Sequence, residues 1–155
     1  MLITGASRGI GKAIAHLFAQ QGAEIFLNGR DETALAQLKD ELVATYSATV
    51  HLAIFDVADV ESVKQGFRTL FAITKSLDVL VNNAGILDDA LIGMVSQAQI
   101  QQTFSTNTFS VLYCSQYAAR MMQRNKQGSI INMASIIGRV GNAGQAVYGG
   151  SKAAV

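Results

Sequence analysis

The sequence Thr-Gly-Ala-Ser-Arg-Gly-Ile-Gly at residues 4–11 decides the fold of this chain. It follows a short apolar segment, residues 1–3, and opens a stretch in which apolar residues recur with helical spacing. Gly5 permits a tight turn, whereas Gly9 and Gly11 let a pyrophosphate and a neighbouring strand approach the backbone closely. The helix start would face the phosphates with free N–H groups and the positive end of its dipole. Packing turns can also contain three glycines, but a strand before the loop and a helix after it predict a dinucleotide-binding loop.

Strand and helix patterns alternate along the rest of the chain. Strands are predicted at residues 24–27, 50–55, 77–81 and 129–134. Helices are predicted after the N-caps Asp31 and Asp59, from Ser96 to Arg124, and again from near Tyr148. Strands joined by helical crossovers of this length lie parallel in one sheet. We therefore predict an α/β protein, a Rossmann-type doubly wound parallel sheet in which residues 1–155 form one domain.

Composition narrows the function classes. The chain has 155 residues, of which 50% are hydrophobic and 15% charged, and this balance argues against intrinsic disorder. The net charge is +1 and no basic cluster stands out, so nucleic-acid binding is not predicted. The single cysteine, Cys114, excludes an internal disulfide, and no apolar run is long enough to span a membrane. Together with the absence of a signal-peptide pattern, these features predict a cytoplasmic protein. His16 and His51 lack metal-spaced partners, so no metal site is predicted.

The end of the second predicted strand bears on the cofactor. NAD sites usually place a carboxylate there to bond the adenosine ribose. This sequence has Asn28, Gly29 and Arg30 instead, and Asp31 is better explained as a helix cap. Arg30 and Arg8 could converge on a 2′-phosphate, which a guanidinium binds well, so NADP(H) is favoured. The alternative is that both arginines are solvated surface residues.

The segment Asn-Asn-Ala-Gly at residues 82–85 follows the fourth predicted strand. Its small residues would allow the backbone to run beneath a cofactor, and Asn82 could link adjacent strands. An ordinary turn would use the same residue types. Its place at the carboxyl end of a parallel strand favours ligand binding, because ligands bind at that edge of open parallel sheets.

Three side chains suggest the chemistry. Tyr148 and Lys152 are four residues apart at a helix start, so they project from one face. A nearby ammonium stabilises a phenolate, which makes a tyrosine a better proton donor near neutrality. Such a tyrosine can protonate a carbonyl oxygen while hydride reaches the carbon. Ser135, at the end of the fifth strand, could hold the same oxygen beside Tyr148.

The glycine spacing and four later segments resemble the short-chain dehydrogenase/reductase family. Those segments are Asp56-Val57, residues 82–85, Asn107 with Ser135, and Tyr148-Gly149-Gly150-Ser151-Lys152. The resemblance implies that Tyr148 is the acid/base, that Lys152 binds the nicotinamide ribose, and that Ser135 orients the carbonyl. It implies a fourth catalytic role for Asn107, holding a water for proton relay, although a helix irregularity would also explain an asparagine there. The cofactor-binding residues implied by the resemblance and the loop are Gly5, Ser7, Arg8, Gly9, Ile10, Gly11, Arg30, Asp56, Val57, Asn83, Ala84, Gly85, Tyr148 and Lys152.

Residues 138–148 and 83–89 are similar to the bacterial 3-oxoacyl-[acyl carrier protein] reductases. The similarity implies reduction of a β-ketoacyl thioester, linked to acyl carrier protein or CoA, in fatty-acid synthesis, by a homotetramer in the full-length form. Reductases of other ketones share much of this pattern. Family members continue for roughly a hundred residues beyond Val155, supplying two strands and a substrate lid. We therefore expect a fragment with the fifth strand as an exposed edge. A non-catalytic dinucleotide-binding module remains the alternative, and an epimerase is disfavoured by the glycine spacing.

Overall fold

Five parallel strands form one sheet in the computed structural model, which describes residues 1–155. The strands are β1 (Leu2–Ile3), β2 (Ile25–Gly29), β3 (Val50–Ile54), β4 (Val79–Asn82) and β5 (Ser129–Asn132). Their order is β3-β2-β1-β4-β5, so Leu2 of β1 pairs with Phe26 on one side and Leu80 on the other. Strand order reverses between β1 and β4, and ligands of doubly wound sheets bind at this point. The predicted fold class is confirmed.

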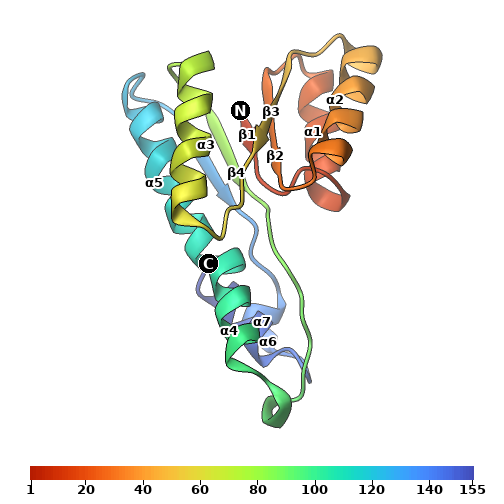
Figure 1. The fold of residues 1–155 in the computed structure, drawn as a ribbon, viewed down its shortest axis with the longest axis vertical. Coiled ribbons are helices and arrows are strands. Elements are labelled where there is room, and N and C mark those ends of the chain that lie inside the picture. Colours follow the sequence, from red (N-terminus) through yellow and green to blue (C-terminus); the bar gives the residue numbers. More distant parts are fainter.

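Helices cover both faces of the sheet (Figure 1). One layer contains α1 (Gly9–Gln20) and α2 (Glu32–Tyr46), and the other contains α3 (Val60–Ile73) and α5 (Ser110–Gln123). A buried apolar cluster lies under each layer, with Ile3 and Leu35 in the first and Phe67 and Cys114 in the second. Because both faces of β1, β2 and β4 are covered, these strands are largely apolar without alternation, as the high hydrophobic content suggested.

Side-chain caps fix where three helices begin. Asp31 accepts a hydrogen bond from the Ala34 N–H at 3.0 Å, and Asp59 accepts one from Ser62 at 2.7 Å. Ser96 caps α4 (Gln97–Phe104) in the same way. Both caps predicted from the sequence are confirmed.

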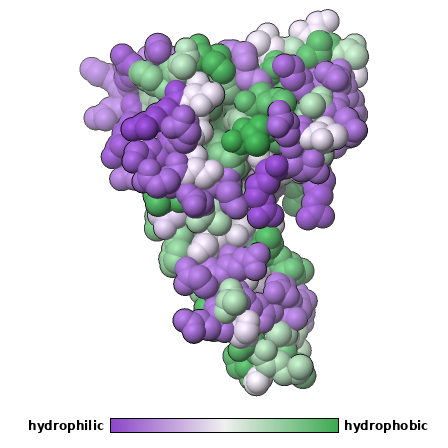
Figure 2. All heavy atoms as spheres, viewed as in Figure 1, coloured by the Kyte–Doolittle hydropathy of each residue, from purple (hydrophilic) through white to green (hydrophobic).

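An arm extends beyond the sheet and carries the end of the chain (Figure 1). It contains α4, α6 (Ile137–Val140), α7 (Ala146–Ala153) and a 3₁₀ turn at Ile92–Met94. Large apolar side chains are exposed on this arm, among them Ile92 at 77% and Met94 at 76%. The lower end of the molecule is accordingly hydrophobic in Figure 2.

The structure corrects one helix of the sequence prediction. The expected continuous helix from Ser96 to Arg124 is divided into α4, a π-helical segment at Ser105–Phe109, and α5. The last helix begins at Ala146, two residues before Tyr148, and the short helix α6 was not predicted. Strand ends differ from the predicted ends by one or two residues, because side-chain alternation does not mark where strand pairing stops.

β5 is an edge of the sheet, as predicted. It pairs only with β4, and all four of its residues are exposed. None of the helices has the length and apolar character needed to cross a membrane.

Candidate functional site

The glycine loop after β1 has a backbone that only glycine fits easily. Gly5 and Gly9 adopt φ angles of +63° and +56°, in the left-handed region. Gly11 is required for close packing, because a Cβ placed there would lie 2.3 Å from the Gly5 carbonyl oxygen. The first N–H groups of α1 have no intrahelical acceptor, and the N-cap residue Arg8 supplies no side-chain bond to them. The loop therefore presents free donors at the strand-order reversal.

Thr4 and Asn83 bind the glycine loop to the end of β4. The Thr4 hydroxyl oxygen accepts hydrogen bonds from the N–H groups of Asn83 and Ala84, both at 3.0 Å. The Asn83 amide donates to the carbonyl oxygens of Thr4 and Gly5 at 2.9 and 3.0 Å. A Cβ on Gly5 would lie 2.8 Å from the Ala84 Cα, so the two segments are in close contact. Asn82 points to β5 and donates to the Asn132 side chain at 2.9 Å, which confirms that it links adjacent strands.

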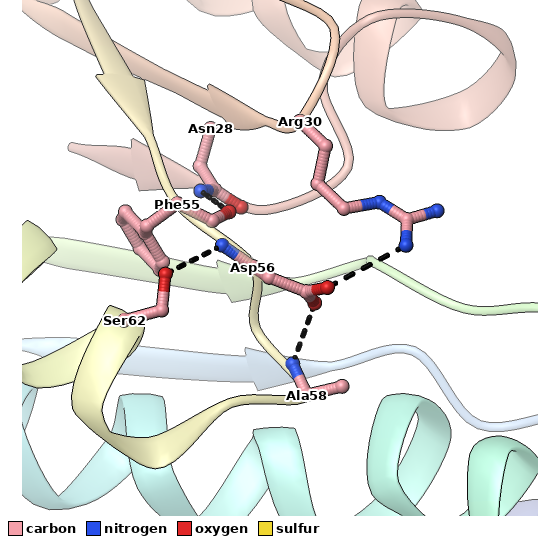
Figure 3. A network of polar contacts seen from close by, with 6 residues as sticks. All are labelled: Asn28, Arg30, Phe55, Asp56, Ala58 and Ser62. Carbon is pink, nitrogen blue, oxygen red and sulfur yellow. Dashed lines mark hydrogen bonds and ion pairs between the residues drawn. The ribbon is translucent and has the colours of Figure 1, made fainter.

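The ends of β2 and β3 are joined by the polar network of Figure 3. The buried Asn28 amide donates to the carbonyl oxygens of Ala53 and Phe55 at 2.8 and 3.0 Å. Its Oδ1 atom is also buried and has no hydrogen-bond partner. Asn28 is therefore buried against the backbone at the end of β3.

Asp56 is held by three partners in the same network (Figure 3). Its N–H donates to the Ser62 hydroxyl at 3.0 Å, and its Oδ1 accepts from the Ala58 N–H at 2.9 Å. The Arg30 guanidinium reaches its other oxygen at 3.5 Å, although the Arg30 side chain is 71% exposed. Val57, the next residue, is buried. Arg30 is thus paired with a carboxylate, whereas Arg8 and Ser7 lie in the glycine loop.

Asn107 lies in the π-helical segment and is completely buried. Its Oδ1 accepts from the Ile86 N–H at 2.8 Å, and its Nδ2 donates to the Ile86 carbonyl at 2.9 Å. The same nitrogen donates to the Ser151 hydroxyl of α7 at 3.0 Å. Asn107 therefore connects the segment after β4 to the helix that carries Tyr148.

Lys152 is buried on α7 and donates from Nζ to the Met133 carbonyl at 2.6 Å. Burial lowers the pKa of its ammonium from the ordinary lysine value, because desolvation disfavours the charged form. No carboxylate lies within ion-pair distance of it. A Cβ placed on Gly85 would lie 3.3 Å from Asn107 Oδ1 and 3.5 Å from Lys152 Nζ, so these two side chains converge on the Gly85 backbone.

Tyr148 and Ser135 are both half-buried at the edge of this group. The Ser135 hydroxyl accepts a hydrogen bond from the Ile137 N–H at 3.2 Å. Ser151 donates to the Tyr148 carbonyl at 2.7 Å, which ties the first turn of α7 to Asn107. No hydrogen bond joins the side chains of Tyr148, Ser135 and Lys152 to one another.

Sequence reasoning missed the supporting role of Ser151 and of the Ile86 and Met133 backbone groups. Ser151 lies inside the quoted Tyr148 motif, so its position was available as a signal. The backbone partners of Asn107 and Lys152 carry no residue-type signal, because any residue supplies the same N–H and carbonyl groups.

The fold and the site are those of a dinucleotide-binding α/β protein. They combine a parallel sheet, a glycine loop where the strand order reverses between β1 and β4, and the pair Tyr148 and Lys152 on α7. The chain belongs to the short chain dehydrogenase family, whose sequence pattern matches residues 1–155. Members of this family are oxidoreductases that use nicotinamide dinucleotides.

Three relatives illustrate the similarity. The 3-oxoacyl-[acyl-carrier-protein] reductase FabG of Staphylococcus aureus strain Mu50 is 38% identical over 154 residues, 99% of this chain and 63% of the relative. The enzyme of the same name from Escherichia coli K12 is 38% identical over 152 residues, 98% of this chain and 61% of the relative. A crystal structure from Sinorhizobium meliloti 1021, of a protein designated a short-chain alcohol dehydrogenase, aligns with a TM-score of 0.92 at 34% identity. It covers 99% of this chain and 60% of that protein, so the chain spans less than two thirds of each relative.

Proposed function

We propose that this chain supplies the cofactor site and the catalytic motif of an NADPH-dependent reductase of 3-oxoacyl thioesters. The observation that carries the proposal is the convergence of Lys152 and Asn107 on Gly85, with Tyr148 one helical turn from Lys152. This group lies next to the strand-order reversal, where a dinucleotide would bind.

The residues present fit a dinucleotide. The free N–H groups at the start of α1 suit a pyrophosphate, and Gly9 leaves open space there, since a Cβ on it would contact nothing. Asp56 and Val57 would flank the adenine, and Asn83, Ala84 and Gly85 would lie beneath the nicotinamide half. Arg30 and Arg8 would meet the 2′-phosphate, which requires Arg30 to exchange its Asp56 partner for the phosphate.

NADPH supplies the hydride in such a reaction. Tyr148 would donate a proton from its hydroxyl to the carbonyl oxygen of the substrate, as a general acid. Ser135 would donate a hydrogen bond to that oxygen and fix its orientation. Lys152 would bind the nicotinamide ribose from Nζ. Asn107 would hold a water through which the Tyr148 proton is replaced, and because its amide is bonded to Ile86 and Ser151, the water would bind its main-chain carbonyl oxygen.

The substrate class rests on the names of the relatives. The reductases of Staphylococcus aureus and Escherichia coli are named for 3-oxoacyl groups on acyl carrier protein, and both align over nearly the whole of this chain. The second candidate, reduction of another ketone or oxidation of an alcohol, is favoured by the Sinorhizobium meliloti neighbour with its TM-score of 0.92. A non-catalytic dinucleotide-binding role would retain the glycine loop without turnover.

An NADPH-oxidation assay with a β-ketoacyl thioester tests the proposal, run on this chain and on a longer form that spans its relatives' length. In an active form, Tyr148→Phe should lower turnover about 10²–10⁴-fold, as loss of a general acid does, with NADPH binding near normal. Ser135→Ala should lower turnover alone, whereas Lys152→Ala should weaken both turnover and NADPH binding. Near-full activity of Tyr148→Phe would contradict the mechanism. Turnover of a simple alcohol but not of the thioester would favour the second candidate.

The cofactor preference can be measured on the chain itself. NADPH should bind at least about tenfold more tightly than NADH, which requires only about 1.4 kcal/mol. Arg30→Ala should remove most of this preference, because it removes the guanidinium closest to the expected phosphate. Lys39→Ala on α2 is the matched control and should leave the ratio unchanged. Equal affinities in the unaltered chain would contradict the assignment.

We also propose that a longer form assembles as a homotetramer through the segment Ser96–Arg124 and the helix of Tyr148. Two observations support this proposal: the chain carries little charge, and the side chains of Leu112 and Phe109 are 65% and 38% exposed. Light scattering should give the mass of a tetramer for the longer form, and a stable monomer would refute this proposal.

A further inference from the structure

A groove of about 450 Å³ lies between α3 and α5, on a surface that the proposed reaction does not use. Phe109 and Leu112, the exposed residues on which the tetramer proposal rests, do not line it. Apolar and aromatic side chains form its floor, and three cations form its rim. The floor consists of Phe67, Phe71, Tyr117 and Met121, and the rim of Lys64, Arg68 and Arg120. The corresponding region of Figure 2, at the upper left, is predominantly hydrophilic.

Positive charge is concentrated in the segments of α3 and α5, which form this groove, although the whole chain is nearly neutral. Half of the twelve Lys and Arg residues lie in residues 60–75 and 110–126, where Glu61 is the only acidic residue. They are Lys64, Arg68, Lys75, Arg120, Arg124 and Lys126. Glu61 is paired with Lys64 at 2.8 Å, and none of the other five cations has an ion-pair partner. The surface therefore carries unneutralised charge beside apolar side chains.

The cations are arranged on the aromatic rings. Lys75 Nζ lies 4.3 Å from the ring centre of Phe71, the Arg124 guanidinium lies 5.4 Å from the same ring, and Arg120 lies 5.4 Å from Tyr117. A guanidinium held over a ring keeps the N–H groups of its edge free for a carboxylate. Nucleic-acid bases need open ring faces on which to stack, and here cations cover them. A second copy docked face to face would set one set of cations against another.

We propose that the groove between α3 and α5 docks an acidic segment of a partner protein, which inserts an apolar side chain between the edges of Phe71 and Tyr117 and places carboxylates against Arg68 and Arg120. The apolar floor would supply contact area, and the cations would fix how the partner segment is aligned in the groove. This division of roles is typical of protein interfaces.

A labelled synthetic peptide tests this directly, using the whole chain and fluorescence anisotropy. The probe is Glu-Glu-Leu-Leu-Glu-Glu, and the control peptide of equal charge replaces both leucines with serine. The probe should bind at least about tenfold more tightly than the control peptide, a difference of about 1.4 kcal/mol. Arg68→Glu with Arg120→Glu should weaken the probe at least tenfold, about the same free energy. Phe71→Ser should weaken it without any change of charge.

Lys39→Glu with Arg139→Glu is the matched control, with the same charge change on two cations that do not line the groove. It should leave probe binding unchanged, and equal weakening would overturn the proposal. Equal binding of the two peptides would also overturn it, because the apolar floor would then contribute nothing. Displacement of the probe by a single-stranded oligonucleotide of equal charge at the same concentration would assign the surface to nucleic acid instead. Self-association in sedimentation that the groove variant abolishes would assign it to a second copy.

Discussion

Gly11→Ala offers the sharpest test of the glycine loop, because the substitution adds one methyl group at a closed position. The new Cβ would lie 2.3 Å from the Gly5 carbonyl oxygen, 2.7 Å from the Asn83 amide nitrogen and 3.0 Å from the Ala6 Cα. Two of these atoms belong to the backbone, so a change of side-chain rotamer cannot relieve the contact. The loop, the end of β4, or both must move.

The net effect on stability is the difference between opposing contributions. Overpacking costs about 1–3 kcal/mol. Displacing Asn83 weakens its hydrogen bonds to Thr4 and Gly5, each worth about 0.5–1.5 kcal/mol. Alanine inside α1 returns about 1 kcal/mol relative to glycine through helix propensity. We expect a net loss of about 2–3 kcal/mol in the free energy of unfolding, together with weaker NADPH binding.

Gly150→Ala is the matched control, since it makes the same change inside α7. Its Cβ would meet only the tip of Phe104 at 3.6 Å, an ordinary contact, so stability should rise by up to about 1 kcal/mol. Urea unfolding followed by circular dichroism measures both variants. Equal stability of Gly11→Ala and the unaltered chain would refute the close packing of the loop against β4.

Three further predictions concern single groups. Burial raises the pKa of the Cys114 thiol to about 12. A thiol reagent at mildly alkaline pH should therefore modify Cys114 only after denaturant is added. Rapid modification of the native chain would contradict its burial. The pKa of Lys152 is lowered in the folded chain, so between that lowered pKa and 10.5 the unfolded chain binds more protons than the folded chain. The free energy of unfolding should therefore rise with pH across that window. Lys152→Met should flatten the rise. Asp59→Ala removes the hydrogen bond to the Ser62 N–H and should lower the free energy of unfolding in urea by about 1 kcal/mol, as should Asp31→Ala. Asp40 is exposed and caps no helix, so Asp40→Ala should change this free energy by no more than about 0.5 kcal/mol.

The elements that sequence reasoning located correctly depend on neighbouring residues alone. Asp31 and Asp59 cap helices because each side chain reaches an N–H three residues ahead. The glycine loop is recognised from its own spacing between a strand and a helix. Neither inference requires knowledge of which strand lies beside which.

Features that depend on strand register could not be predicted in this way. Asn28 turns inward because β2 and β3 pair so that the carbonyl oxygens of Ala53 and Phe55 face its amide. The sequence predicts that Arg30 binds the 2′-phosphate of the cofactor, whereas in the structure its ion-pair partner is Asp56, 26 positions along the chain. Only the parallel pairing of the two strands brings those side chains together.

The π-helical segment at Ser105–Phe109 explains why one predicted helix performs two tasks. An extra residue in a helical turn rotates the buried face of everything that follows. Before it, α4 packs against α7 of the arm, and after it, α5 packs against α3 and β4. Asn107 lies at the change of direction, where its amide meets both the Ile86 backbone and Ser151. A regular helix would pack against only one of these two surfaces. From the sequence, a helix irregularity is an alternative to a catalytic role for Asn107. The two are compatible, because the same distortion places Asn107 and Lys152 against Gly85.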